Sequence, residues 1–269
     1  AWDEGVAFYT GSLEGTDLGG TSAGEMPYRL AEKRCNNFKT CGSKGDSTTG
    51  ISKVNSDLFE LFLEGEMLLS AGKCASVRPI VDQIVSKMTI PLVQGTLRYA
   101  YKVGTGSDTT PKAKAEGAVF AASVLPLVYY CDSLSGFAAT STATTIYDNM
   151  KVGAASTSFT AVKAAFESNY GCLGISCAEV GGLYAGSAYL SADASPCTGY
   201  SAIAGYWPGS DVTEHNKIDL DQDAITTSLK SGDFLSAKTM YTTGANSQGS
   251  NGFRTLQGFS TSAQAKMYE

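Results

Sequence analysis

The residues best placed to do chemistry are glutamates inside helical segments that are otherwise apolar. Residues 57–69 form a helical pattern that is apolar nearly all round, yet Glu60 and Glu64 lie at i and i+4, on one face. Residues 113–127 repeat the pattern, with Glu116 ahead of an alanine-rich apolar run. A buried carboxylate is costly unless it is paired, protonated or bound to a metal. Two such helices predict a ligand site.

Neighbouring segments bring further oxygen donors and a cation. Arg98 and Tyr101 lie along one stripe of the helical segment 76–102, and Asp3 and Glu4 open the first helical segment. The chain has a single histidine, so oxygen ligands dominate, which disfavours zinc and copper and suits ferric iron or calcium. A tyrosine loses its proton only to a strongly polarising metal, and a phenolate ligand therefore favours ferric iron over calcium.

Two interpretations of these polar groups remain open from the residues alone. In the first, they form a buried salt-bridge network in which Arg98 and Lys112 neutralise two of the acids. In the second, they form a hard-cation site in which Arg98 holds an anion that completes the coordination. Helical bundles do host metals on inward-facing carboxylates, so the second interpretation has structural precedent.

Two other motifs favour plainer interpretations. Residues 20–24 match the G-x-S-x-G pattern around Ser22, but a glycine-rich loop precedes them, and His215, the sole histidine, precedes Asp219. Residues 219–223 resemble the start of a calcium loop, yet they lack the glycine and the final glutamate that such a loop requires. We expect these aspartates to cap and charge the start of a helix near residue 221.

Composition and charge exclude some classes of partner. Only 17% of the 269 residues are charged, and the net charge is -6, with no basic patch. We therefore expect no nucleic-acid partner. No stretch of about twenty apolar residues and no signal peptide are visible, so we expect a mature, secreted protein without a membrane span.

The cysteine spacing indicates an oxidising compartment. Cys35/Cys41 and Cys172/Cys177 are spaced as small disulfide loops, and Cys131/Cys197 is a candidate third pair. Cys74 is then the odd thiol. Connectivity is not determined by the sequence.

Apolar periodicity predicts helices along most of the chain, and strand signals are weak throughout. Pro91 marks a kink or a break in one helix, and Pro111 suits the first turn of the next. Residues 133–145 are expected to be a loop or a mobile arm, and residues 183–211 irregular. We predict a mainly α fold, a helical bundle with long Gly/Ser/Tyr-rich loops, forming a single domain over residues 1–269. The expected helices span residues 2–13, 26–38, 54–70, 76–102, 112–131, 159–170 and 221–243.

Several segments resemble the algal iron-assimilation proteins, also described as high-carbon-dioxide-inducible periplasmic proteins. The longest is residues 1–15, AWDEGVAFYTGSLEG, and shorter matches are residues 61–66, 115–120 and 217–221. The resemblance implies a secreted or periplasmic protein that captures ferric iron for uptake, without catalysis. Carbonate or bicarbonate is the implied co-ligand, and a cell-surface iron transporter or reductase the implied partner.

The resemblance and the residue types together give a candidate ligand set. Four candidates lie in matching segments and are carboxylates: Asp3, Glu4, Glu64 and Glu116. Three rest on residue type and spacing alone: Glu60, Tyr101 and, as the anion holder, Arg98.

One departure from the family bears on domain organisation. In the family, the segment resembling residues 217–269 leads into the Trp-Asp-Glu motif, whereas here that motif comes first. The chain is therefore either one permuted or trimmed unit whose ends pack together, or part of a longer repeated protein. Two other classes remain as alternatives: a secreted hydrolase or peptidase-like enzyme using Ser22 or the buried acids, and an extracellular interaction protein whose acids form structural salt bridges.

Overall fold

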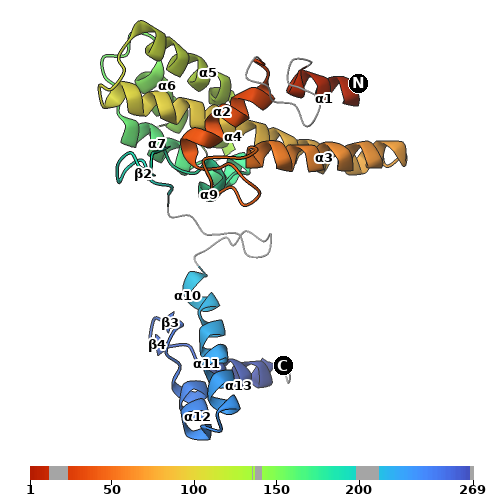
Figure 1. Cartoon of the computed structure of the whole chain (residues 1–269), viewed down its shortest axis with the longest axis vertical. Helices are drawn as coiled ribbons and strands as arrows, with labels where there is room; N and C mark the ends of the chain where they lie inside the picture. The colour runs from red at the N-terminus through yellow and green to blue at the C-terminus, as the bar shows by residue number, and fades with distance from the viewer. Residues whose placement is uncertain (12–23, 135, 137–140, 198–211, 267–269) are drawn as a thin grey trace. The chain divides into compact units, whose positions relative to one another are not determined.

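The computed structural model describes residues 1–11, 24–134, 136, 141–197 and 212–266 (Figure 1). By its internal contacts the chain separates into two compact units, Ala1–Gly199 and Tyr200–Glu269, and each is described by itself. The regular structure is helical apart from two small two-stranded sheets, which confirms the mainly α prediction. That residues 1–269 act as a single domain stays a prediction.

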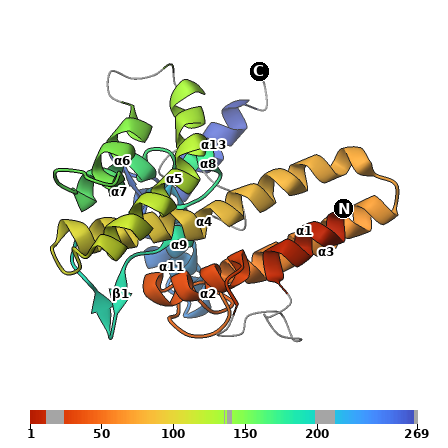
Figure 2. The same ribbon diagram turned by 90° about the horizontal axis from the view of Figure 1, so that it is seen from above.

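The first unit is built around one long helix. This helix, α4 (Val77–Gly104), packs against α2 (Pro27–Phe38), α3 (Lys53–Ser70), α5 (Pro111–Leu134) and α7 (Phe159–Glu167). Figure 2 shows α3 and α4 side by side, with α1 (Trp2–Thr10) along α3. The remaining elements are a 3-10 turn (Cys74–Ser76), α6 (Thr142–Met150), α8 (Tyr170–Leu173), α9 (Cys177–Val180) and the hairpin β1 (Tyr184–Ala185) and β2 (Ala188–Tyr189).

Buried apolar side chains explain why α4 is continuous. Ile90 and Val93 are fully buried in the core, and Pro91 between them is buried too. An interior proline costs about 3 kcal/mol, and packing on several sides of α4 offsets that cost. The helix therefore runs through Pro91, so of the predicted kink or break the break does not occur, and the kink stays a prediction.

Residues 133–145 are only in part the predicted loop, because α6 begins at Thr142. The Ser141 hydroxyl caps this helix by accepting from the backbone N–H of Thr144 at 3.2 Å. The buried carboxylate of Asp132 accepts from the Ala143 backbone N–H at 2.9 Å and from the hydroxyls of Ser141 and Thr142. These hydrogen bonds outweigh burial and hold the pKa of Asp132 below its usual value. The Ser and Thr residues that resembled a loop are a helix cap.

The disulfides confirm one predicted pair and correct two. Cys35–Cys41 is present, and Cys74 is a free, exposed thiol. The predicted Cys172–Cys177 and Cys131–Cys197 pairs are wrong, since the structure joins Cys131 to Cys172 and Cys177 to Cys197. The physical reason is tertiary: α8 packs against α5, which brings Cys172 to Cys131, and Cys177 begins the separate helix α9.

The second unit contains α10 (Thr213–Asn216), α11 (Ile218–Lys230), α12 (Phe234–Thr243), the hairpin β3 (Gln248–Gly249) and β4 (Gly252–Phe253), and α13 (Leu256–Lys266). The single helix predicted over residues 221–243 is two helices. Gly232 adopts a φ of 78°, and Asp233 caps α12 by accepting from the Ser236 N–H at 3.0 Å. A glycine with positive φ followed by a capping aspartate ends one helix and starts another.

Asp219 and Asp221 lie in the first turn of α11, as predicted. Asp221 is fully buried, and its Oδ1 accepts from the backbone N–H groups of Ala245 at 3.2 Å and Asn246 at 3.1 Å. The Asn246 side-chain amide donates to the same oxygen at 2.6 Å. Asp221 therefore fixes the loop after α12 and is structural.

Helix α5 is long and apolar enough, by length and composition, to cross a membrane. Sequence reasoning did not single out this helix as a candidate span, and the absence of a membrane span stays a prediction. Val124, Val128 and Cys131 on this helix are nevertheless buried against the rest of the first unit. Helices in protein cores can meet the same criteria of length and hydropathy, so meeting them does not place α5 in a membrane.

Candidate metal and anion centre

The acids that the sequence places on buried helical faces are mostly at the surface. Glu60 and Glu64 on α3, and Asp3 and Glu4 on α1, are all exposed. The buried face of α3 is narrow, because Val54, Leu58, Phe62 and Gly65 are turned inward while Leu63 and Met67 are 59% and 65% exposed. The premise that this helix is buried all round is wrong. Ligand roles for these four acids stay predictions.

A different pair of oxygens meets between α4 and α5. The Tyr99 hydroxyl donates a hydrogen bond to Oε2 of Glu116. Tyr99 is 8% exposed, and its ring stacks on Phe120 with centroids 5.9 Å apart. Gly117 permits this approach, since a Cβ there would lie 2.9 Å from the Cβ of Tyr99. The helix contact thus holds a phenol and a carboxylate against each other.

Cations surround this pair. The Arg98 guanidinium lies 5.3 Å from the centroid of the Tyr99 ring, and Lys102 Nζ lies 5.7 Å from it. Lys112 Nζ is 3.9 Å from Oε1 of Glu116. Burial and the hydrogen bond to Glu116 raise the pKa of Tyr99 above its ordinary value, although Arg98 opposes them. The phenol is therefore protonated at neutral pH in the metal-free protein.

Arg34, on α2, adds a buried cation beside the pair. It is 8% exposed, and its Nε and Nη1 atoms have no hydrogen-bond partner among the described residues. Burial, and then the neighbouring Arg98, lower its pKa from the usual value to about 10. The guanidinium is still charged at neutral pH, so the charge lies inside the protein without a contacting counter-ion in the described part of the chain.

The structure therefore brings together only some of the predicted residues. Glu116 and Arg98 both lie against Tyr99. Tyr101, by contrast, packs edge-on against Phe159, and its hydroxyl donates to the Leu190 carbonyl at 3.4 Å. Sequence reasoning missed Tyr99, the tyrosine at the site. The available signal was the glycine after Glu116, which marks a close approach of another element.

Charged side chains elsewhere form ion pairs, such as those of Lys87 with Asp57 and Glu179. Within the described residues, no group of three or more His, Cys, Asp and Glu side chains is arranged to hold a metal. Ser22 and most of its motif lie outside the described residues, and His215 belongs to α10 in the second unit.

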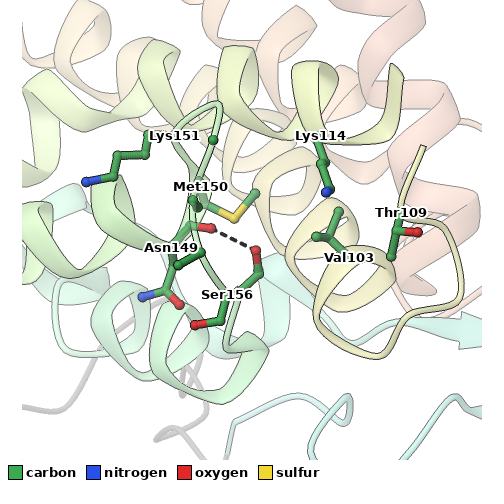
Figure 3. A pocket seen from close by; sticks show the side chains of 11 residues that line it. Val103, Thr109, Lys114, Asn149, Met150, Lys151 and Ser156 are labelled. Carbon is green, nitrogen blue, oxygen red and sulfur yellow. Dashed lines mark hydrogen bonds between the residues drawn. The ribbon is translucent and has the colours of Figure 1, made fainter. Parts of the chain in front are cut away.

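A small cavity of about 240 Å³ lies between the α4–α5 and α6–α7 connections (Figure 3). Lys114 extends over it towards Val103, whereas Lys151 points away from it. Its lining contains no carboxylate. This cavity offers a cation and backbone groups, and no set of metal ligands.

Comparison with known proteins yields one match. The model of a family described as low iron-inducible periplasmic protein matches residues 183–268. No curated protein and no solved structure matches the chain. The matched region includes the segment 217–221 on which the resemblance partly rested, and the Trp-Asp-Glu motif of α1 lies outside it. The periplasmic description agrees with the predicted secreted or periplasmic location. Residues 183–268, about a third of the chain, are thus similar to the low iron-inducible periplasmic protein family.

Proposed function

We propose that this protein captures ferric iron outside the plasma membrane for assimilation by the cell, and that it does so without catalysis. The observation that carries the proposal is the Tyr99–Glu116 pair flanked by Arg98. A phenolate and a carboxylate are hard oxygen ligands that suit a trivalent cation. The family match at residues 183–268, with its low-iron and periplasmic description, supports an iron-related role.

Local charge favours capture of iron together with an anion. Arg98, Arg34 and Lys112 lie around the Tyr99–Glu116 pair, which contributes one carboxylate, and together they would repel a bare cation. A carbonate or bicarbonate held by Arg98 offsets this positive charge and supplies further oxygen donors. Iron binding then displaces the phenolic proton of Tyr99, so affinity rises with pH.

The other predicted carboxylates have a separate part in the proposal. Asp3 and Glu4 on α1 and Glu60 and Glu64 on α3 are exposed carboxylates, which we propose act as an acidic surface. Such a surface attracts cations before they reach a partly buried site. A cell-surface transporter or reductase that receives the iron also remains part of the proposal.

Metal content and an optical spectrum test this function. The protein is mixed with ferrous salt in aerated bicarbonate buffer, so that ferric iron forms without a chelator, and is then desalted. We expect about one iron per chain and a visible phenolate-to-iron charge-transfer band. Tyr99→Phe should remove the band, and Tyr101→Phe is the matched control that should retain it. Absence of retained iron in the unmodified protein would contradict the proposal.

A further inference from the structure

A second feature of the first unit is a cavity of about 580 Å³ bounded by α2, the segment after Cys41 and α4. Four cationic side chains line it, Arg29, Lys33, Arg34 and Arg98, together with one carboxylate, Glu32. The protein as a whole has a net charge of -6, so this excess of positive charge is local. A concave site of this size falls in the range that holds small organic ligands.

The single carboxylate in the lining offsets only one of these four positive charges, and its Oε1 is bonded to other groups. Oε1 of Glu32 accepts from the Ser52 backbone N–H at 2.9 Å and from the Asn55 side-chain amide at 2.6 Å. Those bonds tie Glu32 to the start of α3. Lys33 lies 3.8 Å from Glu25, whose side chain is 87% exposed, and an exposed pair of this kind is weak.

The arginines, by contrast, have unused donors. Nε of Arg29 and both Nε and Nη1 of Arg34 are buried without a hydrogen-bond partner among the described residues. Oδ1 of Asn37, which also lines the cavity, is a buried acceptor without a partner in the same part of the chain. Unpaired buried charge is costly, whereas a bound anion that accepts from these guanidinium groups removes the cost. The unused donors and the single acceptor together match an anion that also carries a hydroxyl group.

We propose that this cavity is a binding site for a hydroxy-polycarboxylate anion of the citrate class. Its carboxylates would accept from Arg29, Arg34 and Arg98, and its hydroxyl would donate to Asn37. The size of the cavity, about 580 Å³, favours such a ligand over a single carbonate or phosphate, each of which would fill only a small part of it.

Arg98 connects this cavity with the candidate iron site, because it also lies over the ring of Tyr99. This part of the inference rests on the proposed function: the protein would receive ferric iron as a complex with a polycarboxylate carrier. Citrate-class anions chelate ferric iron through the same oxygens that guanidinium groups recognise. The anion site itself does not depend on iron and is tested without it.

The test measures citrate binding to the iron-free, full-length chain by titration calorimetry and by the shift in thermal unfolding temperature. Citrate should release or absorb measurable heat and raise the unfolding temperature, because it binds the folded state alone. Arg34→Gln should weaken citrate binding about tenfold or more, since a buried charge-assisted contact is lost. Arg29→Gln, at a half-buried position, should weaken it as well and is the variant of choice if Arg34→Gln does not fold.

Arg78→Gln is the matched control. Arg78, on α4, is likewise a helix arginine of the first unit, but its side chain is 80% exposed, pairs with Asp82 at 3.0 Å and does not line the cavity. Its replacement should leave citrate binding unchanged. Inorganic phosphate and bicarbonate, tested in parallel, should bind more weakly than citrate.

The outcomes separate this inference from the iron function. Citrate binding that Arg34→Gln and Arg29→Gln weaken and Arg78→Gln does not would support the site, even if the protein retains no iron. Absence of citrate binding, equal effects of all three substitutions, or phosphate binding as tightly as citrate would overturn it. None of these results depends on the spectrum of an iron-loaded protein.

Discussion

The same dipeptide, Glu-Gly, occurs on two helices with different surroundings. On α3, Glu64–Gly65 receives the ring of Trp2, and a Cβ on Gly65 would lie 2.2 Å from the indole Cζ2 atom. On α5, Gly117 lies against the Cβ of Tyr99, which would be 2.9 Å from an added Cβ. In both places a helix glycine makes room for an aromatic residue of a neighbouring helix.

The two glutamates differ because the two rings carry different donors. The Trp2 indole N–H donates to the Phe62 carbonyl at 3.1 Å, which leaves the exposed Glu64 without an ion pair or hydrogen bond to another described side chain. The Tyr99 hydroxyl donates to Glu116, and cations from α4 and α5 lie nearby. The chemistry of each acid is set by the ring and the charges that the fold brings to it.

The largest expected difference between the two regions is in iron affinity. Glu116→Gln should weaken iron binding about a hundredfold, because it removes a charged ligand and the partner of Tyr99. Glu64→Gln should change iron binding little, since no phenol or arginine lies beside Glu64 in the described structure. Equilibrium competition with a ferric chelator measures both constants. An equal loss of iron affinity in both variants would show that Glu64 is also a ligand and would contradict the comparison.

The next difference is in stability. Gly117→Ala places a methyl group 2.8 Å from Met150 Cε and 2.9 Å from Tyr99 Cβ, both in the core. We expect it to lower the free energy of unfolding by about 1–3 kcal/mol. Gly65→Ala meets the half-buried Trp2 ring near the end of α1, which can move aside, so its cost should be smaller. Urea denaturation of both variants gives the two values, and a larger loss for Gly65→Ala would show that α1 is held rigidly.

The sequence predicts the helices far better than the contacts between them. Periodicity places α2, α3 and α5 within a few residues, because each buries one apolar face. Sequence reasoning chose Tyr101 rather than Tyr99 as the candidate ligand. These two residues point about 200° apart around α4. Which of them meets Glu116 depends on how α4 packs against α5, and the pairing of Cys131 with Cys172 depends on packing in the same way. Arg34 escaped notice because nothing in its local sequence shows that it is buried.

A smaller effect should follow from removing the donor of the Trp2 ring. Trp2→Phe keeps an aromatic ring against Gly65 and Phe62 but deletes the N–H bond to the Phe62 carbonyl. The expected loss is about 1 kcal/mol of unfolding free energy. Thermal or urea denaturation measures it, and iron binding should not change. A change in iron affinity would mean that the α1–α3 contact and the α4–α5 contact are coupled.

The last difference concerns the pH at which Tyr99 ionises. Burial and the bond to Glu116 raise the pKa of Tyr99 in the folded state, so folding favours the neutral phenol. The contribution of Tyr99 to the free energy of unfolding is therefore lost as the pH rises through its raised, folded-state pKa. Glu116→Gln removes the negative charge of Glu116 and should lower the pKa of Tyr99. Difference titration at the phenolate absorbance, with Tyr99→Phe as the blank, resolves this one tyrosine. Glu64→Gln should leave the titration unchanged, and a shift there as large as that of Glu116→Gln would show that the charge on α3 reaches the pair.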